Sequence, residues 1–244
     1  MKGAFFNALL IVRESAWVLF GFFVITAVGF SLILGAIPNS ESFTSTTTGS
    51  LLLNALIYTV ALIVIVFPTY LKRSKSQVLM LLGIRNNFSW SILWRPGFAW
   101  LGYMLATIVA GIAVRYLVPW IDSDQAQDVG FNNITLPIEY VLAFLALVIL
   151  PPIAEELIFR GYLFGKLRSR LGVVGTTIIV SLLFGFVHMQ WNVAVDTAIL
   201  SIFLCYLREK TGSIWACMVL HAIKNGLAYF ILFIAPLLGL QLLQ

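Results

Sequence analysis

Long apolar stretches separated by short polar ones extend along almost the whole chain. They cover residues 16–37, 51–71, 97–119, 137–164, 173–190, 194–208 and 213–235. A helix needs about 20 mainly apolar residues to cross a bilayer, and these stretches lack the alternation of membrane barrel strands. The pattern therefore predicts an all-α fold, a polytopic transmembrane helix bundle of about seven spans.

Composition and charge support a membrane environment and suggest an orientation. Of the 244 residues, 61% are hydrophobic and 10% are charged, whereas an ordinary soluble domain is about 25% charged. Basic residues gather at alternate span ends, which predicts that these ends are cytoplasmic: Lys2, Arg13, Lys72, Arg73, Lys75, Arg85, Arg95, Lys166, Arg168, Arg170, Arg208 and Lys210. The opposite loops carry acids and no Lys or Arg: Glu41, Asp122, Asp124 and Asp128.

We therefore expect a multi-pass protein of the cell membrane, with its N-terminus in the cytoplasm and its C-terminus outside. The lipid bilayer is its expected partner, and the topological use of the basic residues argues against a nucleic-acid partner. The apolar residues of segment 76–94 are too interrupted for a span but suit an interfacial helix on the basic side. Cys205 and Cys217 lie in apolar stretches and are interpreted as small hydrophobic residues. We expect two parts, residues 1–136 with the first three spans and residues 137–235 with the rest.

The second part holds the ionisable residues that are costly in a membrane. A charge at the bilayer centre costs at least about 2.5–3.5 kcal/mol, so such residues are functional candidates. They are Glu155, Glu156, Arg160, His188, His221 and Lys224, and Asn225 is the polar neighbour. The pairs Glu156–Arg160, Phe184–His188 and His221–Asn225 have i,i+4 spacing and so share helix faces.

Glu155 is left unpaired within its own segment. If Leu171–Gly172 forms a turn, Glu155 and His188 lie level in a hairpin, in a site inside the membrane that is reached from the basic side. Pro151 and Pro152 predict a kinked or restarted helix just before the glutamates.

These residue types suit hydrolysis by an activated water. A carboxylate and a histidine can orient and deprotonate water, and an Asn/His pair can donate hydrogen bonds to an oxyanion. Two histidines and a carboxylate also form a zinc or iron ligand set, but there is no HExxH motif, so a metal-free site with no cofactor is favoured over zinc. No Ser or Cys is placed for a nucleophilic couple with histidine.

In their order and spacing, these motifs resemble the CPBP intramembrane proteases, which include the type II CAAX prenyl endopeptidases and the Abi proteins linked to bacteriocin immunity. The motifs are Glu155-Glu156-x-x-x-Arg160, Phe184-x-x-x-His188 and His221-x-x-x-Asn225, and the resemblance covers about residues 137–232. It implies a glutamic endopeptidase with Glu155 as the base and His188 as its partner. His221 and Asn225 would form the oxyanion hole. Glu156 and Arg160 would position Glu155, and Phe184 would line the substrate pocket. Lys224 is a departure from the family pattern that could pair with Asp196 or point into the site.

The expected function is therefore hydrolysis of a peptide bond in a membrane-associated peptide or lipidated protein. Two alternatives remain open. A non-catalytic immunity-type membrane protein would keep the motifs as structure, with Glu156 and Arg160 as an ion pair and Asn225 joining helices. A proton-coupled transporter could use the same Glu and His residues as a relay, but it predicts polar residues in both halves of the chain. Substrate identity and oligomeric state stay open.

Overall fold

Helices make up every regular element of the described part of the chain, which confirms the predicted all-α class. The computed structural model describes residues 2–36, 42–43, 46–84, 94–118, 120, 131 and 134–240. The α-helices are α1 (Lys2–Ala36), α3 (Thr47–Lys72), α4 (Lys75–Leu82), α5 (Trp94–Leu117), α6 (Pro137–Phe144), α7 (Leu150–Glu156), α8 (Phe164–Phe186), α9 (Trp191–Thr211), α10 (Trp215–Tyr229) and α11 (Ala235–Leu237). The π-helical segments are η2 (Leu145–Ile149), η3 (Leu157–Leu163) and η4 (Phe230–Ile234).

Five helical segments among the described residues are long and apolar enough to cross a membrane. They are Thr47–Lys72, Trp94–Leu117, Pro137–Phe186, Trp191–Thr211 and Trp215–Leu237. The segment Pro137–Phe186 contains two of the predicted spans, which are separated by a break at Gly172, where φ is 69°. A positive φ favours glycine, so the predicted Leu171–Gly172 turn is present. The first predicted span falls in α1.

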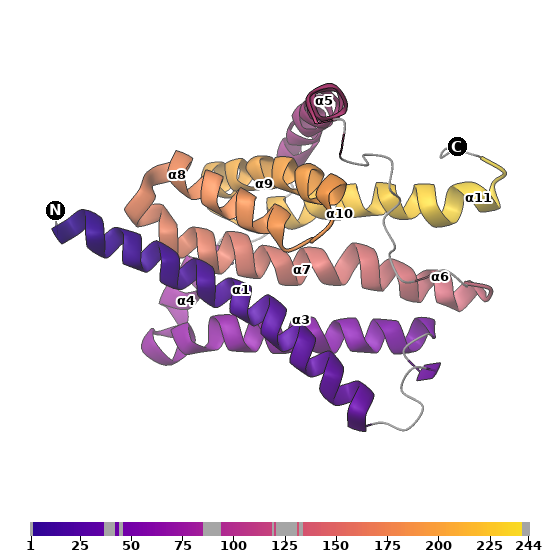
Figure 1. The fold of residues 1–244 in the computed structure, drawn as a ribbon, viewed down its shortest axis with the longest axis horizontal. Helices are drawn as coiled ribbons and strands as arrows, with labels where there is room; N and C mark the ends of the chain where they lie inside the picture. The colour runs from indigo at the N-terminus through magenta and orange to yellow at the C-terminus, as the bar shows by residue number, and fades with distance from the viewer. Residues whose placement is uncertain are drawn as a thin grey trace.

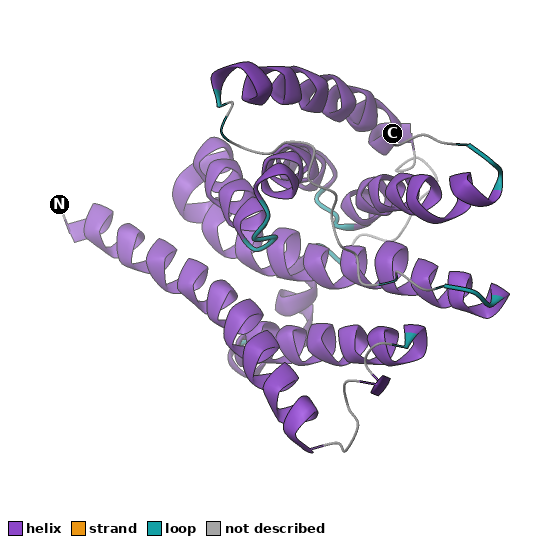
Figure 2. Ribbon diagram, turned by 45° about the vertical axis from the view of Figure 1, so that its right-hand side comes forward, coloured by secondary structure: helices purple, strands orange, loops and turns teal. Residues whose placement is uncertain are grey.

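The continuous helix from α6 to η3 runs through the middle of the bundle (Figure 1). On one side it packs against α3, which α1 crosses, and on the other against α10. Helices α8 and α9 pack closely as an antiparallel pair. Gly185 permits this close approach, because a Cβ at this position would lie only 2.5 Å from the carbonyl oxygen of Ala194. Helix α5 lies on the outside, against α9 and α10 (Figure 2).

Many large apolar side chains face outward, and several charged ones lie inside. On α5, Leu101, Leu105 and Ile108 are 60–66% exposed, which suits contact with lipid. The interior instead buries Glu156 and Arg160 completely. A charge removed from water must be paired, and these two pair with each other one turn apart on the same helix.

The short helix α4 occupies the first part of the predicted interfacial segment. Ser74 caps its N-terminus in a capping box with Gln77, and Gly83 ends it at a φ of 73°. Residues 85–93 and the acidic residues Asp122, Asp124 and Asp128 lie outside the described residues. The rest of the predicted interfacial helix is therefore left as a prediction.

Candidate active site

Two prolines shape the helix that carries the glutamates. Pro151 and Pro152 lie in the first turn of α7, directly after the π-helical segment η2. An α-helix would pair the Leu147 carbonyl with the N–H of residue 151, and a π-helix with that of residue 152. Neither proline has an N–H. The Leu147 carbonyl instead accepts a 2.9 Å hydrogen bond from Nδ2 of Asn225 on α10.

Glu156 is held by two partners in the packed interior. Its Oε1 lies 3.0 Å from Nη1 of Arg160, one turn further along the same helix, as the i,i+4 spacing predicts. The same oxygen lies 2.9 Å from Nδ1 of His221 on α10. A carboxylate oxygen can only accept, so Nδ1 of His221 carries the proton and Nε2 points the other way. Glu156 therefore fixes the orientation of the His221 ring.

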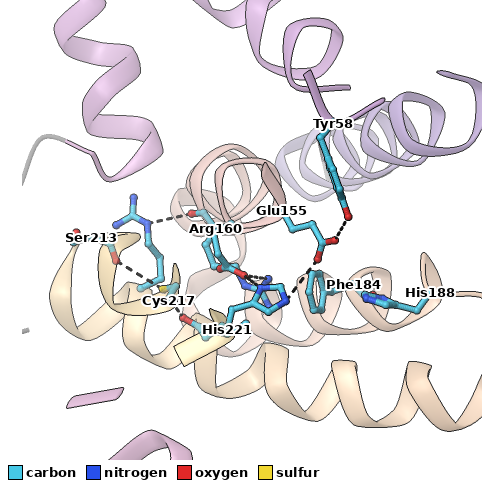
Figure 3. A network of polar contacts seen from close by, with 11 residues as sticks. Tyr58, Glu155, Arg160, Phe184, His188, Ser213, Cys217 and His221 are labelled. Carbon is cyan, nitrogen blue, oxygen red and sulfur yellow. Dashed lines mark hydrogen bonds and ion pairs between the residues drawn. The ribbon is translucent and has the colours of Figure 1, made fainter. Parts of the chain in front are cut away.

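Glu155 directly precedes Glu156 in the chain but occupies a different environment. Its Oε1 accepts a 2.7 Å hydrogen bond from the hydroxyl of Tyr58, on α3 (Figure 3). Its Oε2 is buried and has no hydrogen-bond partner among the described residues. This oxygen lies 3.9 Å from Nε2 of His221, which is too far for a direct hydrogen bond and suits a bridging water.

His188 lies at the end of α8, on the far side of Phe184 from His221 (Figure 3). Its Nδ1 lies 2.7 Å from the Phe184 carbonyl oxygen, which can only accept, so Nδ1 donates and Nε2 remains for other partners. The Phe184 ring is fully buried and packs edge-to-face against both histidines, at centroid distances of 5.1 Å to His188 and 5.7 Å to His221. Arg160 stacks over it at 4.2 Å. Phe184 therefore supports the two imidazoles from behind and is not among the cavity-lining residues.

A cavity of about 200 Å³ connects most of these groups. The polar side chains that line it include Tyr58, Glu155, His188, His221, Lys224 and Asn225. Glu156 and Arg160 are not among its lining residues. The volume is below the roughly 300–1,000 Å³ of typical ligand sites, so the cavity suits water and part of a substrate.

The cavity does not lie toward the basic helix ends, through which we expected the site to be reached. It includes Leu147 and Pro151, which precede Glu155 on its helix, and Tyr229 and Leu232, which follow His221. The basic residues near the Gly172 turn and at the end of α9 lie in the opposite direction along these helices. The cavity thus extends from Glu155 away from the basic helix ends.

Several residues with a role at the site were missed from the sequence. Tyr58 lies in an apolar stretch with no local signal that it would meet a carboxylate. Arg208, interpreted as a topological charge, is 9% exposed, and its Nε donates to the Arg160 carbonyl at 3.1 Å. Glu14 is 3% exposed and accepts a 2.6 Å hydrogen bond from Tyr162, which fixes α1 to η3. Each of these contacts joins segments that are far apart in the sequence.

No group of three His, Cys, Asp or Glu side chains with metal-site geometry occurs among the described residues. The two histidine Nδ1 atoms are already engaged, with Glu156 and with the Phe184 carbonyl.

Fold and site together define a polytopic membrane protein with a buried, cavity-facing Glu/His site. Residues 137–227 match the family model described as type II CAAX prenyl endopeptidase Rce1-like. The chain is also 26% identical over 145 residues to the Bacillus subtilis (strain 168) protein named "Putative membrane peptidase YdiL". That match covers 59% of this chain and 57% of the relative, so the chain spans little more than half of the relative's length. No solved structure matches. Both matches support the CPBP resemblance, and the family-model match lies in residues 137–227.

Proposed function

We propose that the protein is an intramembrane endopeptidase that hydrolyses a peptide bond by direct attack of an activated water. One observation carries the proposal: the buried, unpartnered Oε2 of Glu155 lies 3.9 Å from Nε2 of His221, and both residues line one cavity. A water between these atoms can donate a hydrogen bond to each. General acid–base catalysis of this kind contributes about 10²–10⁴-fold to a rate.

In the proposed reaction, the water oxygen bonds to the substrate carbonyl carbon as Glu155 takes a proton from it. Asn225 uses one N–H to hold the Leu147 carbonyl, and its second N–H donates to the oxyanion that forms. The carbon–nitrogen bond then breaks, and the leaving amine takes the proton back. The products are a carboxylic acid and an amine, and no covalent enzyme intermediate is required.

We assign the two histidines roles that differ from those the family resemblance implies. His221 is the histidine with a nitrogen within 4 Å of Glu155 among the described residues, so we assign it to water activation. His188 lines the same cavity with its Nδ1 engaged, and we assign its Nε2 to proton transfer at the substrate amide. Glu156 and Arg160 are positioning residues that act through His221.

We also propose an orientation and a substrate class. The basic helix ends favour a cytoplasmic N-terminus and an outside C-terminus, and the cavity would then face the half of the membrane away from the cytoplasm. The substrate would be a membrane-associated peptide or a lipidated protein, and the site would work without a metal. The bilayer would be the environment of the protein, and no nucleic acid would bind.

Purified protein in detergent, incubated with a panel of quenched membrane-associated peptides, tests this function. Cleavage by the wild type, absent in Glu155→Gln, is the expected result, and it should be unaffected by a chelator. Activity that chelator removes and added zinc restores would contradict the metal-free mechanism. An absence of cleavage across the panel, with full biological activity in Glu155→Gln, would favour the non-catalytic immunity-type alternative.

A further inference from the structure

Lys224 is the basic side chain of the cavity. It lies on α10 between His221 and Asn225, and it lines the cavity together with both. No other Lys or Arg is among the described residues that line this cavity. The family motif does not include Lys224, and the proposed water activation gives its charge no role.

Asp196 of α9 fixes the Lys224 ammonium at the cavity wall. Its Oδ2 lies 3.4 Å from Nζ of Lys224. Its other oxygen, Oδ1, accepts hydrogen bonds from the hydroxyls of Tyr103, at 2.5 Å, and Thr107, at 3.4 Å, both on α5. A lysine ammonium has three N–H donors, and the contact with Asp196 uses one of them. The Lys224 side chain remains 18% exposed, so donors are left for a second acceptor.

We propose that Lys224 forms a subsite for a substrate carboxylate close to the bond that is cleaved. A cation kept inside a membrane protein is costly unless it is paired or used, and charge-assisted hydrogen bonds to carboxylate are among the strongest in proteins. The carboxylate of Glu155 in the same cavity would repel a substrate anion, and Lys224 offsets that repulsion on one wall. An acidic group of the substrate would therefore lie at the Lys224 wall of the cavity and away from Glu155. This inference rests on the proposed protease function and adds a specificity to it.

A purely structural role for the ion pair makes a different prediction. If Lys224 and Asp196 only join α9 to α10, exchanging the two residues would keep the bridge. The exchange removes the acceptor of Tyr103 and Thr107, but it would leave any preference between peptides unchanged. If Lys224 is a subsite, the exchange moves the cation off the cavity wall and puts a carboxylate there. The double variant Lys224→Asp/Asp196→Lys therefore separates the two roles.

The experiment uses a quenched peptide that the wild-type protein cleaves, in four versions. Glu is compared with Gln at the residue next to the cleaved bond, and a free C-terminus is compared with an amidated one. Each ratio of kcat/KM is measured for the wild type, Lys224→Met, the exchanged double variant and the control Lys210→Met. Lys210 lies at the end of α9 and does not line this cavity. Binding of the same four peptides is measured by fluorescence anisotropy.

We expect the wild type and Lys210→Met to prefer one acidic version about 10–100-fold, the range for hydrogen bonds to charged groups. The preferred version shows whether the carboxylate is a side chain or a C-terminus. Lys224→Met and the exchanged variant should lose the preference. Equal ratios in the wild type, or a preference kept by the exchanged variant, would overturn the subsite. If the wild type cleaves nothing, the protease proposal fails, and an acid preference in binding that disappears in Lys224→Met would still support the subsite.

Discussion

Glu155 and Glu156 are adjacent in the chain and face two different regions of the molecule. Glu156 is fully buried, and its Oε1 is shared by Arg160 and His221. Glu155 lines the cavity, with one oxygen held by Tyr58 and the other without a partner among the described residues. Successive helix positions differ by about 100° in direction. One helix therefore holds one carboxylate in the packed interior and the other at the cavity.

His221 contacts both regions, so His221→Ala should have the largest effect. It removes the nitrogen that faces Glu155 and the partner of Glu156. We expect cleavage to fall about 10²–10⁴-fold and the thermal midpoint to fall as well. His188→Ala should reduce cleavage but change the midpoint less, because the printed contacts of His188 are with Phe184, one turn earlier in the same segment. Peptide cleavage and thermal unfolding in detergent measure both effects, and equal midpoint losses in the two variants would contradict the division.

Glu156→Gln should mainly destabilise the protein. Breaking a buried ion pair by removing one partner costs about 3–5 kcal/mol, because the other charge is left buried. The control Glu209→Gln breaks the more exposed pair with Arg168, and exposed pairs contribute about 0–1 kcal/mol. Chemical denaturation compares the two variants. A Glu156→Gln protein as stable as the control would refute the structural role.

Tyr58→Phe tests whether α3 contributes to the site from outside the matched family domain. Loss of a hydrogen bond to a charged group is expected to cost about 1.5 kcal/mol or more, which corresponds to about a tenfold fall in kcat with little change in KM. Tyr70→Phe, on the exposed face of the same helix, should have no effect. An unchanged kcat in a folded Tyr58→Phe protein would show that the contact with Glu155 does not matter for catalysis.

Asn225→Ala should lower stability less than Glu156→Gln, because it leaves one partly buried carbonyl, that of Leu147, without this donor. Such a loss costs about 1–3 kcal/mol. Adding Pro151→Ala gives residue 151 an N–H that can reach this carbonyl in an α-helical arrangement. The double variant should therefore regain part of the lost stability in the same denaturation assay. If it is less stable than Asn225→Ala alone, the proposed origin of this contact is wrong.

Local patterns were enough to predict the helices, the Gly172 turn and the Glu156–Arg160 pair. Each depends on apolar length, a glycine or i,i+4 spacing within one segment. The contacts of Tyr58, Arg208 and Asn225 depend instead on which helices pack together, which no local spacing encodes. For the same reason, the sequence paired Glu155 with His188, whereas His221 on α10 lies closer to it among the described residues.

The central claim is that Glu155, and not its neighbour Glu156, reacts with water. The most direct measurement is cleavage of a quenched peptide by purified Glu155→Gln in liposomes, with the wild type and Glu209→Gln at equal folded concentration. The account predicts activity in the wild type and Glu209→Gln and a fall of about 10²–10⁴-fold in Glu155→Gln, with an unchanged thermal midpoint. A folded Glu155→Gln protein that cleaves at the wild-type rate would contradict it.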